Sequence, residues 1–320
     1  MTQKYKQSIY QKTIKRKASL KGVGLHTGVN STVTFTPAEE NFGIRFKRLD
    51  IDGCPEILAD IDHVIDISRG TSIGQDGFRI HTVEHILAAI TGLQIDNILI
   101  ELTEKEPPVM DGSAKDFVEC IIKSGFQVQN RERKVLEITE AVNYTNSYRD
   151  IDIHVIPSDR FRITFMVEYP LPQLGTQYEA IYNMEEDFAF EVAPARTFCF
   201  LSEVEMLKER GLIQGGALDN AVVIIDKEID QLEMDRIKDL FGIEDEIIKG
   251  ANGILNGKVL RYKNEPVRHK TLDLIGDLAL LGYPIKGHVT AARAGHASNV
   301  EFVKKLKKKY SKELKKLRDK

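Results

Sequence analysis

The stretch HTVEHILAAITG, residues 81–92, organises the first half of the chain. Apolar side chains recur in it at helical spacing, namely at Val83, Ile86, Leu87 and Ile90. Gly92 is a typical C-terminal stop, so we predict a helix here. The run DNILIEL (96–102) that follows is continuously apolar, which is typical of a buried strand.

The segments around this helix indicate an α+β arrangement. Upstream, residues 31–37 and 43–49 alternate apolar and polar side chains, as half-buried antiparallel strands do. Downstream, the prolines and the glycine of 106–113 predict a loop, and 114–125 predicts a second amphipathic helix. The polar, charged stretch 127–134 is where a linker between domains is expected.

We therefore predict two domains, 1–130 and 131–320, with the boundary near residue 130. In the second part, strands are predicted at 134–142, 151–157, 161–169 and 285–295, a hairpin turn at 158–160, and helices at 203–211, 267–282 and from about 298. Residues 81–125 and 267–317 then share one order: helix, apolar strand, glycine-bearing loop, helix. This order suggests two domains of related topology and predicts a site between them.

Composition and charge describe an ordinary globular chain. Its 320 residues are enough for two domains, and 42% are hydrophobic and 29% charged. The net charge of -3 and the pI near 6.3 leave no overall basic field that would attract nucleic acid. We expect no nucleic-acid partner.

Cysteine usage and the N-terminus predict a cytoplasmic protein. Cys54, Cys120 and Cys199 lie far apart without a CxxC pair, which argues against a disulfide framework and against a thiolate zinc cluster. The first residues are polar and basic without the apolar run of a signal peptide, and no stretch approaches the ~20 apolar residues of a membrane span.

Histidine spacing points to metal chemistry. His269 and Asp273 are four residues apart on a predicted helix, so they share one face and could chelate a metal, although an exposed polar face is the alternative. His81 and His85 are also four apart, and a zincin-like pair is therefore a rival. The position of Glu84 directly before His85 favours His85 as a ligand without His81, because the carboxylate of Glu84 could reach a water on the metal. Two histidines and one carboxylate leave a fourth position for water, as in catalytic zinc sites.

Seven motifs follow one another between about residue 10 and residue 300. They are GVGLHTG (22–28), HTVEH (81–85), EPPVMDGSA (106–114), ARTFCF (195–200), GLIQGGALDNAVV (211–223), RHKTLDLIGDL (268–278) and ARAGH (292–296). In this order they resemble the family of UDP-3-O-acyl-N-acetylglucosamine deacetylases, the hydrolases of the committed step of lipid A biosynthesis. The resemblance implies two α+β domains that sandwich their helices between mainly antiparallel sheets, with the active site at the domain junction.

The resemblance also implies roles for individual residues. The zinc (Zn²⁺) ligands would be His85, His269 and Asp273, and the general base would be Glu84. His81 would then be structural.

Four further residues receive roles by the same similarity. His296 would be the cationic group that assists the leaving amine, held by Asp277. Thr197 would contact the oxyanion, and Lys270 would meet the sugar or phosphate side of the substrate.

The family has an insertion in its second domain, expected here at about 198–220, that lines an apolar passage for the acyl chain. Phe198, Leu201 and Leu212 supply its apolar surface, with packed core as the alternative reading. Arg293 occupies a basic position of the family and is expected to meet the diphosphate, or else to be an exposed surface cation.

Two parts of the chain depart from the family pattern or lie outside it. The segment 166–179 differs at Val167 and Tyr169, so the uridine contacts are left unassigned. The chain ends soon after the family's last helix, and we expect no fused dehydratase domain. Its basic terminal helix predicts a solvated face, with weak contact to the anionic inner membrane as the alternative.

Two other functions stay open at this point. One is a zinc amidohydrolase that acts on another acylated amino sugar, and the other is a non-catalytic, metal-stabilised binding module. A binding module would not need Glu84, Thr197 and His296 beside the ligand set, whereas a hydrolase would.

Overall fold

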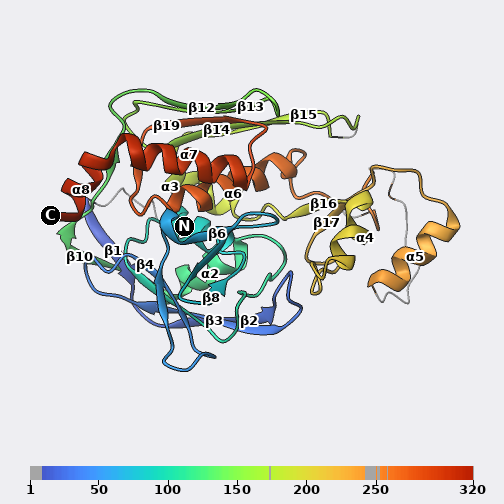
Figure 1. The fold of residues 1–320 in the computed structure, drawn as a ribbon, viewed down its shortest axis with the longest axis horizontal. Helices are drawn as coiled ribbons and strands as arrows, with labels where there is room; N and C mark the ends of the chain where they lie inside the picture. The colour runs from blue at the N-terminus through green and yellow to red at the C-terminus, as the bar shows by residue number, and fades with distance from the viewer. Residues whose placement is uncertain (1–8, 173, 242–249, 251–252, 258, 320) are drawn as a thin grey trace.

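Two five-stranded sheets lie on opposite sides of a layer of helices (Figure 1). The structure, a computed structural model, describes residues 9–172, 174–241, 250, 253–257 and 259–319. The first sheet has the order β2-β3-β9-β4-β5, formed by Ala18–Val23, Asn30–Pro37, Ile98–Leu102, Ile44–Arg48 and Glu56–Leu58. Its strands alternate as predicted: Val33 and Phe35 of β3 are fully buried, because both point toward the helices.

The second sheet repeats the topology of the first. Its order is β12-β13-β19-β14-β15, formed by Val142–Asn146, Ile151–Ile156, His288–Ala292, Arg162–Glu168 and Thr176–Ile181. In each sheet the central strand, β9 or β19, has one antiparallel and one parallel neighbour, and the remaining pairs are antiparallel. The predicted fold class, α+β with related halves and mainly antiparallel sheets, is confirmed.

The hairpin predicted at 158–160 is wrong. Strands β13 and β14 flank this turn but do not pair, because β19 lies between them, antiparallel to β13 and parallel to β14. Strand β13 forms its hairpin with β12 instead. The long-range strand β19 takes the central position because it is apolar on the buried face, where Val289 and Ala291 are almost fully buried.

Four of the helices between the sheets lie close to the predicted ranges 81–92, 114–125, 267–282 and from about 298, whereas the helical segment 184–192 and a separate helix at 311–319 are not predicted. The helices are α1 (Glu84–Gly92), α2 (Lys115–Ser124), α3 (Met184–Asp187) with the π-helical turn Phe188–Val192, α6 (Glu265–Ala279), α7 (His296–Lys309) and α8 (Ser311–Asp319). Helix α1 starts three residues later than predicted, which leaves His81 outside it. The strand predicted at 285–295 is divided into β18 (Ile285–Lys286) and β19.

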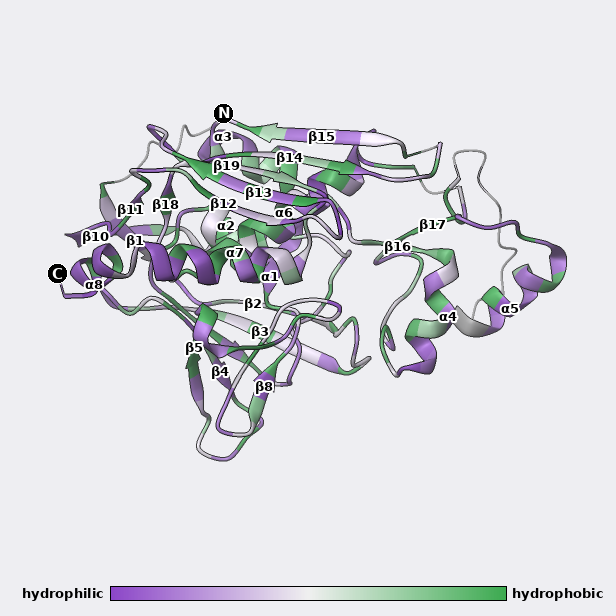
Figure 2. Cartoon of the chain, turned by 45° about the horizontal axis from the view of Figure 1, so that its top comes forward, coloured by the Kyte–Doolittle hydropathy of each residue, from purple (hydrophilic) through white to green (hydrophobic). Residues whose placement is uncertain are grey.

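Helices α1 and α6 pack against each other more closely than a pair of ordinary helix surfaces would allow. Gly276 makes this possible: a Cβ on this residue would lie 2.1 Å from the carbonyl oxygen of Glu84. Apolar side chains from both helices are fully buried around the contact, among them Ile86, Leu87 and Ile275. Figure 2 shows α1, α6 and α7 side by side between the sheets. The first turn of α1 is therefore held against the middle of α6.

The polar stretch 127–134, expected to be a linker, is largely a strand. It contains most of β10 (Phe126–Glu132), which pairs antiparallel with β1 (Tyr10–Ile14). The charged side chains of β10 point to solvent, which explains why its sequence resembles a linker. The domain boundary near residue 130 stays a prediction.

Smaller elements complete the fold. They are η1 (Ile61–His63), the three-stranded sheet of β6 (Val64–Asp66), β7 (Ser72–Gln75) and β8 (Phe78–Ile80), and the pair β11 (Leu136–Glu137) and β18. No helix among the described residues is long and apolar enough to cross a membrane.

One group of elements projects from the side of the layered body (Figure 1). It contains β16 (Phe198–Phe200), α4 (Leu201–Glu209), β17 (Val222–Ile224) and α5 (Gln231–Phe241), and β16 pairs parallel with β17. It has an apolar cluster of its own, formed by Leu201, Val204, Val223, Ile225, Ile237 and Leu255. This unit coincides with the insertion expected at about 198–220 and extends beyond it.

Candidate metal centre

Among the residues that the structure describes, one buried group of three has the donor atoms for a metal ion. It consists of His85 on α1 and His269 and Asp273 on α6, with ligand atoms within 4.8 Å of one another. The Nε2 atoms of His85 and His269 lie 3.8 Å and 3.5 Å from Oδ1 of Asp273. The group therefore joins residues from both halves of the chain at the close contact of α1 and α6.

The chemistry of these donors fits a divalent cation. Nδ1 of His269 lies 3.0 Å from the carbonyl oxygen of Ala195, which can only accept, so Nδ1 carries the proton and Nε2 keeps its lone pair. Burial lowers the pKa of His85 to about 3 and also lowers the pKa of His269. Burial alone would raise the pKa of Asp273, but the neighbouring His269 and Lys270 hold it well below its ordinary value. Two neutral imidazoles and one carboxylate match the ligands that zinc prefers.

Glu84 lies at the first position of α1, directly before His85. Its Oε2 accepts a hydrogen bond of 3.0 Å from the backbone N–H of Thr71, and its Oε1 lies 3.8 Å from Nε2 of His296. Burial raises the pKa of Glu84 to about 7, an effect that the positive charge of His296 opposes. This carboxyl group is therefore poised to exchange a proton near neutral pH.

His296, the first residue of α7, points its Nε2 at the same group of residues. This atom lies 3.9 Å from Oδ2 of Asp273, and Nδ1 lies 2.8 Å from Oδ2 of Asp277. Burial would lower the pKa of His296, but Asp277 and Asp273 outweigh it and raise this pKa to about 10. His296 is thus a cation at neutral pH, with Asp277 behind it.

Lys270 contacts this group of residues directly, and Thr197 is close in the chain to Ala195, whose carbonyl oxygen also contacts the group. Thr197 follows the carbonyl of Ala195 by two residues, and its N–H donates to the carbonyl oxygen of Gly112 over 2.7 Å. Lys270 donates to Oδ2 of Asp273 over 3.2 Å, so its ammonium group is already paired with a carboxylate of the cluster.

Arg293 directly follows β19, the central strand of the second sheet. Its Nε donates to the carbonyl oxygen of Asp150 over 2.5 Å, and its Nη1 lies 3.6 Å from Oε2 of Glu168. Among the residues that the structure describes, no hydrogen bond or ion pair joins Arg293 to the three-residue cluster.

The apolar residues expected to line the acyl passage fall into two groups. The ring of Phe198 stands edge-on to that of His269, with centroids 6.4 Å apart, and it also contacts Tyr169 and Phe200. Leu201 is only 2% exposed within the apolar cluster of the projecting unit, whereas Leu212 is half-buried. Phe198 therefore connects the three-residue cluster to apolar side chains, and Leu201 packs inside the projecting unit.

His81 lies apart from the cluster. Its Nδ1 is within hydrogen-bond distance, 3.0 Å, of Oγ of Ser72, and His81 precedes the first turn of α1.

Two residues that are not predicted from the sequence belong to the candidate site. Thr71 contacts Glu84, Asp277 and His296, and Asn299 donates to Oδ2 of Asp277 over 2.8 Å. Asn299 follows His296 by three residues on one helix face, a usable signal, whereas no pattern marks Thr71.

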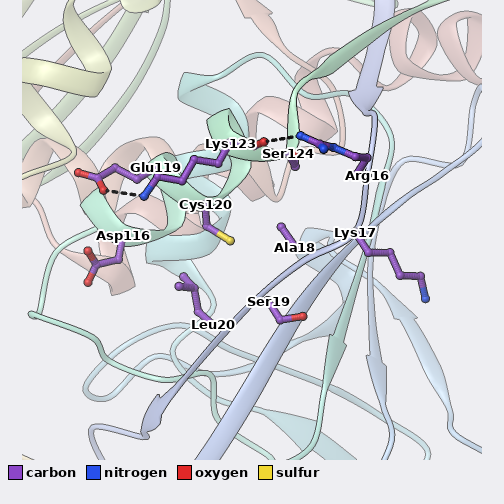
Figure 3. Close-up of a pocket in the computed structure, with 10 residues that line it drawn as sticks. All are labelled: Arg16, Lys17, Ala18, Ser19, Leu20, Asp116, Glu119, Cys120, Lys123 and Ser124. Carbon is purple, nitrogen blue, oxygen red and sulfur yellow. Dashed lines mark hydrogen bonds and ion pairs between the residues drawn. The ribbon is translucent and has the colours of Figure 1, made fainter.

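A separate hollow of about 460 Å³ lies between β2 and α2 (Figure 3). Its wall carries both cations and carboxylates, and Lys123 pairs with Glu119 there. None of the predicted site residues lines it.

Comparison with known proteins gives one consistent result. The sequence model of the UDP-3-O-acyl N-acetylglycosamine deacetylase family matches residues 11–242 and 225–308. The chain is 50% identical over 301 residues to the "Bifunctional enzyme LpxC/FabZ" of Chlorobaculum tepidum, which covers 94% of this chain and 64% of that protein. The chain thus spans about two thirds of the length of this bifunctional relative.

Shorter relatives are covered almost completely. The UDP-3-O-acyl-N-acetylglucosamine deacetylase of Syntrophotalea carbinolica is 41% identical over 93% of this chain and 88% of its own length. The enzyme of that name from Chlamydia pneumoniae is 39% identical over 92% of this chain and 96% of its own length. The seven motifs, the two-sheet fold and these matches agree, and the chain belongs to the UDP-3-O-acyl N-acetylglycosamine deacetylase family.

Proposed function

We propose that the protein hydrolyses the N-acetyl group of UDP-3-O-acyl-N-acetylglucosamine, which yields UDP-3-O-acyl-glucosamine and acetate. The observation that carries this proposal is the buried cluster of His85, His269 and Asp273 with Glu84 and His296 beside it. Membership of the deacetylase family supports the substrate. The reaction would be the committed step of lipid A biosynthesis, and a cytoplasmic location is part of the proposal.

The metal in this proposal is zinc, held by His85, His269 and Asp273. When bound, zinc is a Lewis acid that polarises a carbonyl oxygen and makes water more acidic. The structure supports this assignment through the chemistry of the donors, because both imidazoles are neutral and Nδ1 of His269 is fixed by a backbone carbonyl.

Glu84 and His296, which lie beside the cluster, carry out the two proton transfers of the reaction. Glu84 takes a proton from the water whose oxygen attacks the amide carbon, because its carboxyl group exchanges protons near pH 7. As the C–N bond breaks, His296 gives its proton to the leaving nitrogen, since an amine leaves readily only when protonated. Asp277 keeps His296 charged and oriented, and Thr197 is proposed to contact the oxygen that becomes negative.

Substrate recognition follows from the surroundings of the cluster. Phe198 and the projecting unit with Leu201 and Leu212 are proposed to bind the acyl chain, which is supported by the contact of Phe198 with His269. Lys270 and Arg293 are proposed to meet the sugar and diphosphate.

Two further parts of the proposal concern the whole chain. We propose that 1–130 and 131–320 are separate domains, which is supported by the same five-stranded topology in each part. The exposed lysines of α7 and α8 are proposed to allow weak contact with an anionic membrane surface.

The proposal is tested by acetate release from UDP-3-O-acyl-N-acetylglucosamine with the purified protein. We expect turnover that a chelator abolishes and added zinc restores. UDP-N-acetylglucosamine without the acyl chain is the control and should be a much poorer substrate, because each buried CH₂ contributes about 0.8 kcal/mol. Zinc binding without acetate release from either compound would favour a binding module and overturn the proposal.

A further inference from the structure

We propose that Thr71 is a positioning residue that sets the separation between Glu84 and the Asp277–His296 pair. Thr71 is fully buried and lies directly before β7, in the part of the chain between the first sheet and α1. It contacts both groups that the proposed function uses for proton transfer. The inference rests on that function and assigns a role to a residue outside all seven motifs.

The hydroxyl group of Thr71 donates a hydrogen bond to Asp277. Its oxygen lies 2.6 Å from Oδ1 of Asp277 and 3.3 Å from Nδ1 of His296. The single hydroxyl proton goes to the shorter contact, because Nδ1 of His296 is itself engaged with Oδ2 of Asp277 at 2.8 Å. Asp277 therefore accepts from Thr71 on one oxygen and from His296 and Asn299 on the other.

These three donors hold the carboxylate plane of Asp277 in one orientation. A carboxylate with one donor can turn about its Cβ–Cγ bond, whereas donors on both oxygens oppose this rotation. Since Asp277 orients His296, the hydroxyl group of Thr71 acts on the direction in which Nε2 of His296 points. It does so without touching the substrate side of the imidazole.

The backbone of Thr71 holds the carboxylate of Glu84. Its N–H donates to Oε2 of Glu84 over 3.0 Å, and its carbonyl oxygen accepts from the N–H of Val83 over 3.0 Å. Oε1 of Glu84 is then left facing Nε2 of His296 at 3.8 Å. The preceding residue has to be small, because a Cβ on Gly70 would lie 2.7 Å from Oε1 of Glu84.

One residue thus connects both proton-transfer groups. Its main chain holds the carboxylate of Glu84 and its side chain holds the carboxylate behind His296, so the two are fixed relative to each other. Preorganisation of this kind lowers the cost of reaching the reactive geometry and acts on kcat more than on KM.

The test compares three variants of the zinc-loaded, full-length protein. Thr71→Val keeps the shape and the backbone contacts but removes the hydroxyl group, and Thr71→Ser keeps the hydroxyl group. Thr271→Val is the matched control, because Thr271 is equally buried and its hydroxyl group donates only to the carbonyl oxygen of Val267 in its own helix.

We expect Thr71→Val to lower kcat by about 10- to 100-fold with little change in KM and with stoichiometric zinc retained. Thr71→Ser should restore most of the rate, and Thr271→Val should leave it close to that of the wild type. Equal losses in Thr71→Val and Thr271→Val would overturn the inference, because loss of any buried hydroxyl group would then explain them.

A second measurement does not need activity. In histidine-labelled protein, the ¹H–¹⁵N resonance of His296 Nδ1–H is assigned by its absence in His296→Gln. We expect it to shift or broaden in Thr71→Val and to stay in place in Thr71→Ser and Thr271→Val. An unchanged resonance in Thr71→Val would overturn the inference even if kcat fell. If the wild type released no acetate, the proposed function would fail, and this comparison would still decide the role of Thr71.

Discussion

Replacement of Gly276 by alanine should open the candidate metal site by pushing α1 away from α6. A Cβ at this position would lie 2.1 Å from the carbonyl oxygen of Glu84 and 2.9 Å from its Cα, whereas ordinary contacts begin at 3.4 Å. The atoms in the way belong to backbone and cannot rotate aside. The start of α1 would have to retreat by about 1.3 Å, far more than the ~0.2 Å tolerance of metal–ligand distances.

This movement acts directly on the cluster, because His85 is the residue after Glu84 and the other two ligand candidates lie on α6. We expect Gly276→Ala to weaken zinc binding by at least about tenfold and to lower the free energy of unfolding by about 1–3 kcal/mol, as overpacking does in other cores. Zinc content by elemental analysis, competition with a chelator and thermal unfolding measure both effects.

Gly295→Ala is the control for this prediction, because a Cβ on Gly295 meets nothing within 4 Å. It should retain stoichiometric zinc with wild-type affinity. If Gly276→Ala bound zinc as tightly as Gly295→Ala and unfolded at the same temperature, the close approach of α1 and α6 would not be what assembles the site.

Three further predictions concern the site itself. Asp273→Ala should lose stoichiometric zinc and His81→Ala should retain it, and the reverse result in elemental analysis would mean that the ligand set is wrong. The profile of kcat/KM against pH should be bell-shaped: activity rises as Glu84 loses its proton and falls as His296 loses its own. The pKa values of about 7 and about 10 apply without metal, and a bound cation lowers both, because it favours the carboxylate and disfavours the imidazolium. Asp277→Asn should move the basic limb to lower pH, since the imidazolium loses its carboxylate partner, and an unmoved limb would assign that limb to another group.

Local patterns predicted the main helices and several strands of the two five-stranded sheets, whereas the strand predicted at 134–142 is a strand only at 136–137 and at 142. The helical period of 81–92 and 267–282 and the alternation of 31–37 predict the observed helices and strand, because burial on one face leaves a period of 3.6 or 2 in the sequence. The errors have a common cause. The local pattern predicts a linker in place of β10 and a hairpin of β13 and β14, because the true partners of these strands, β1 and β19, lie more than a hundred residues away in sequence.

In the candidate site too, the contact within one helix is predictable from the sequence and the long-range contact is not. The i, i+4 pair of His269 and Asp273 was visible in the sequence, since one helix determines its geometry. The role of Thr71 was not visible, because Thr71 meets Asp277 across 206 residues and neither carries a periodic signal for the contact.

The sequence by itself determined the family, the fold class and the helix on which two ligand candidates share a face. These follow from motifs and periods that are local in the chain. Only the tertiary structure decided which residues from the two halves meet: the absence of a side chain on Gly276 brings His85 to His269 and Asp273, and the buried position of Thr71 joins Glu84 to Asp277. Contacts of this kind depend on how two packed surfaces fit together, and that fit is a property of the folded chain and not of any one segment.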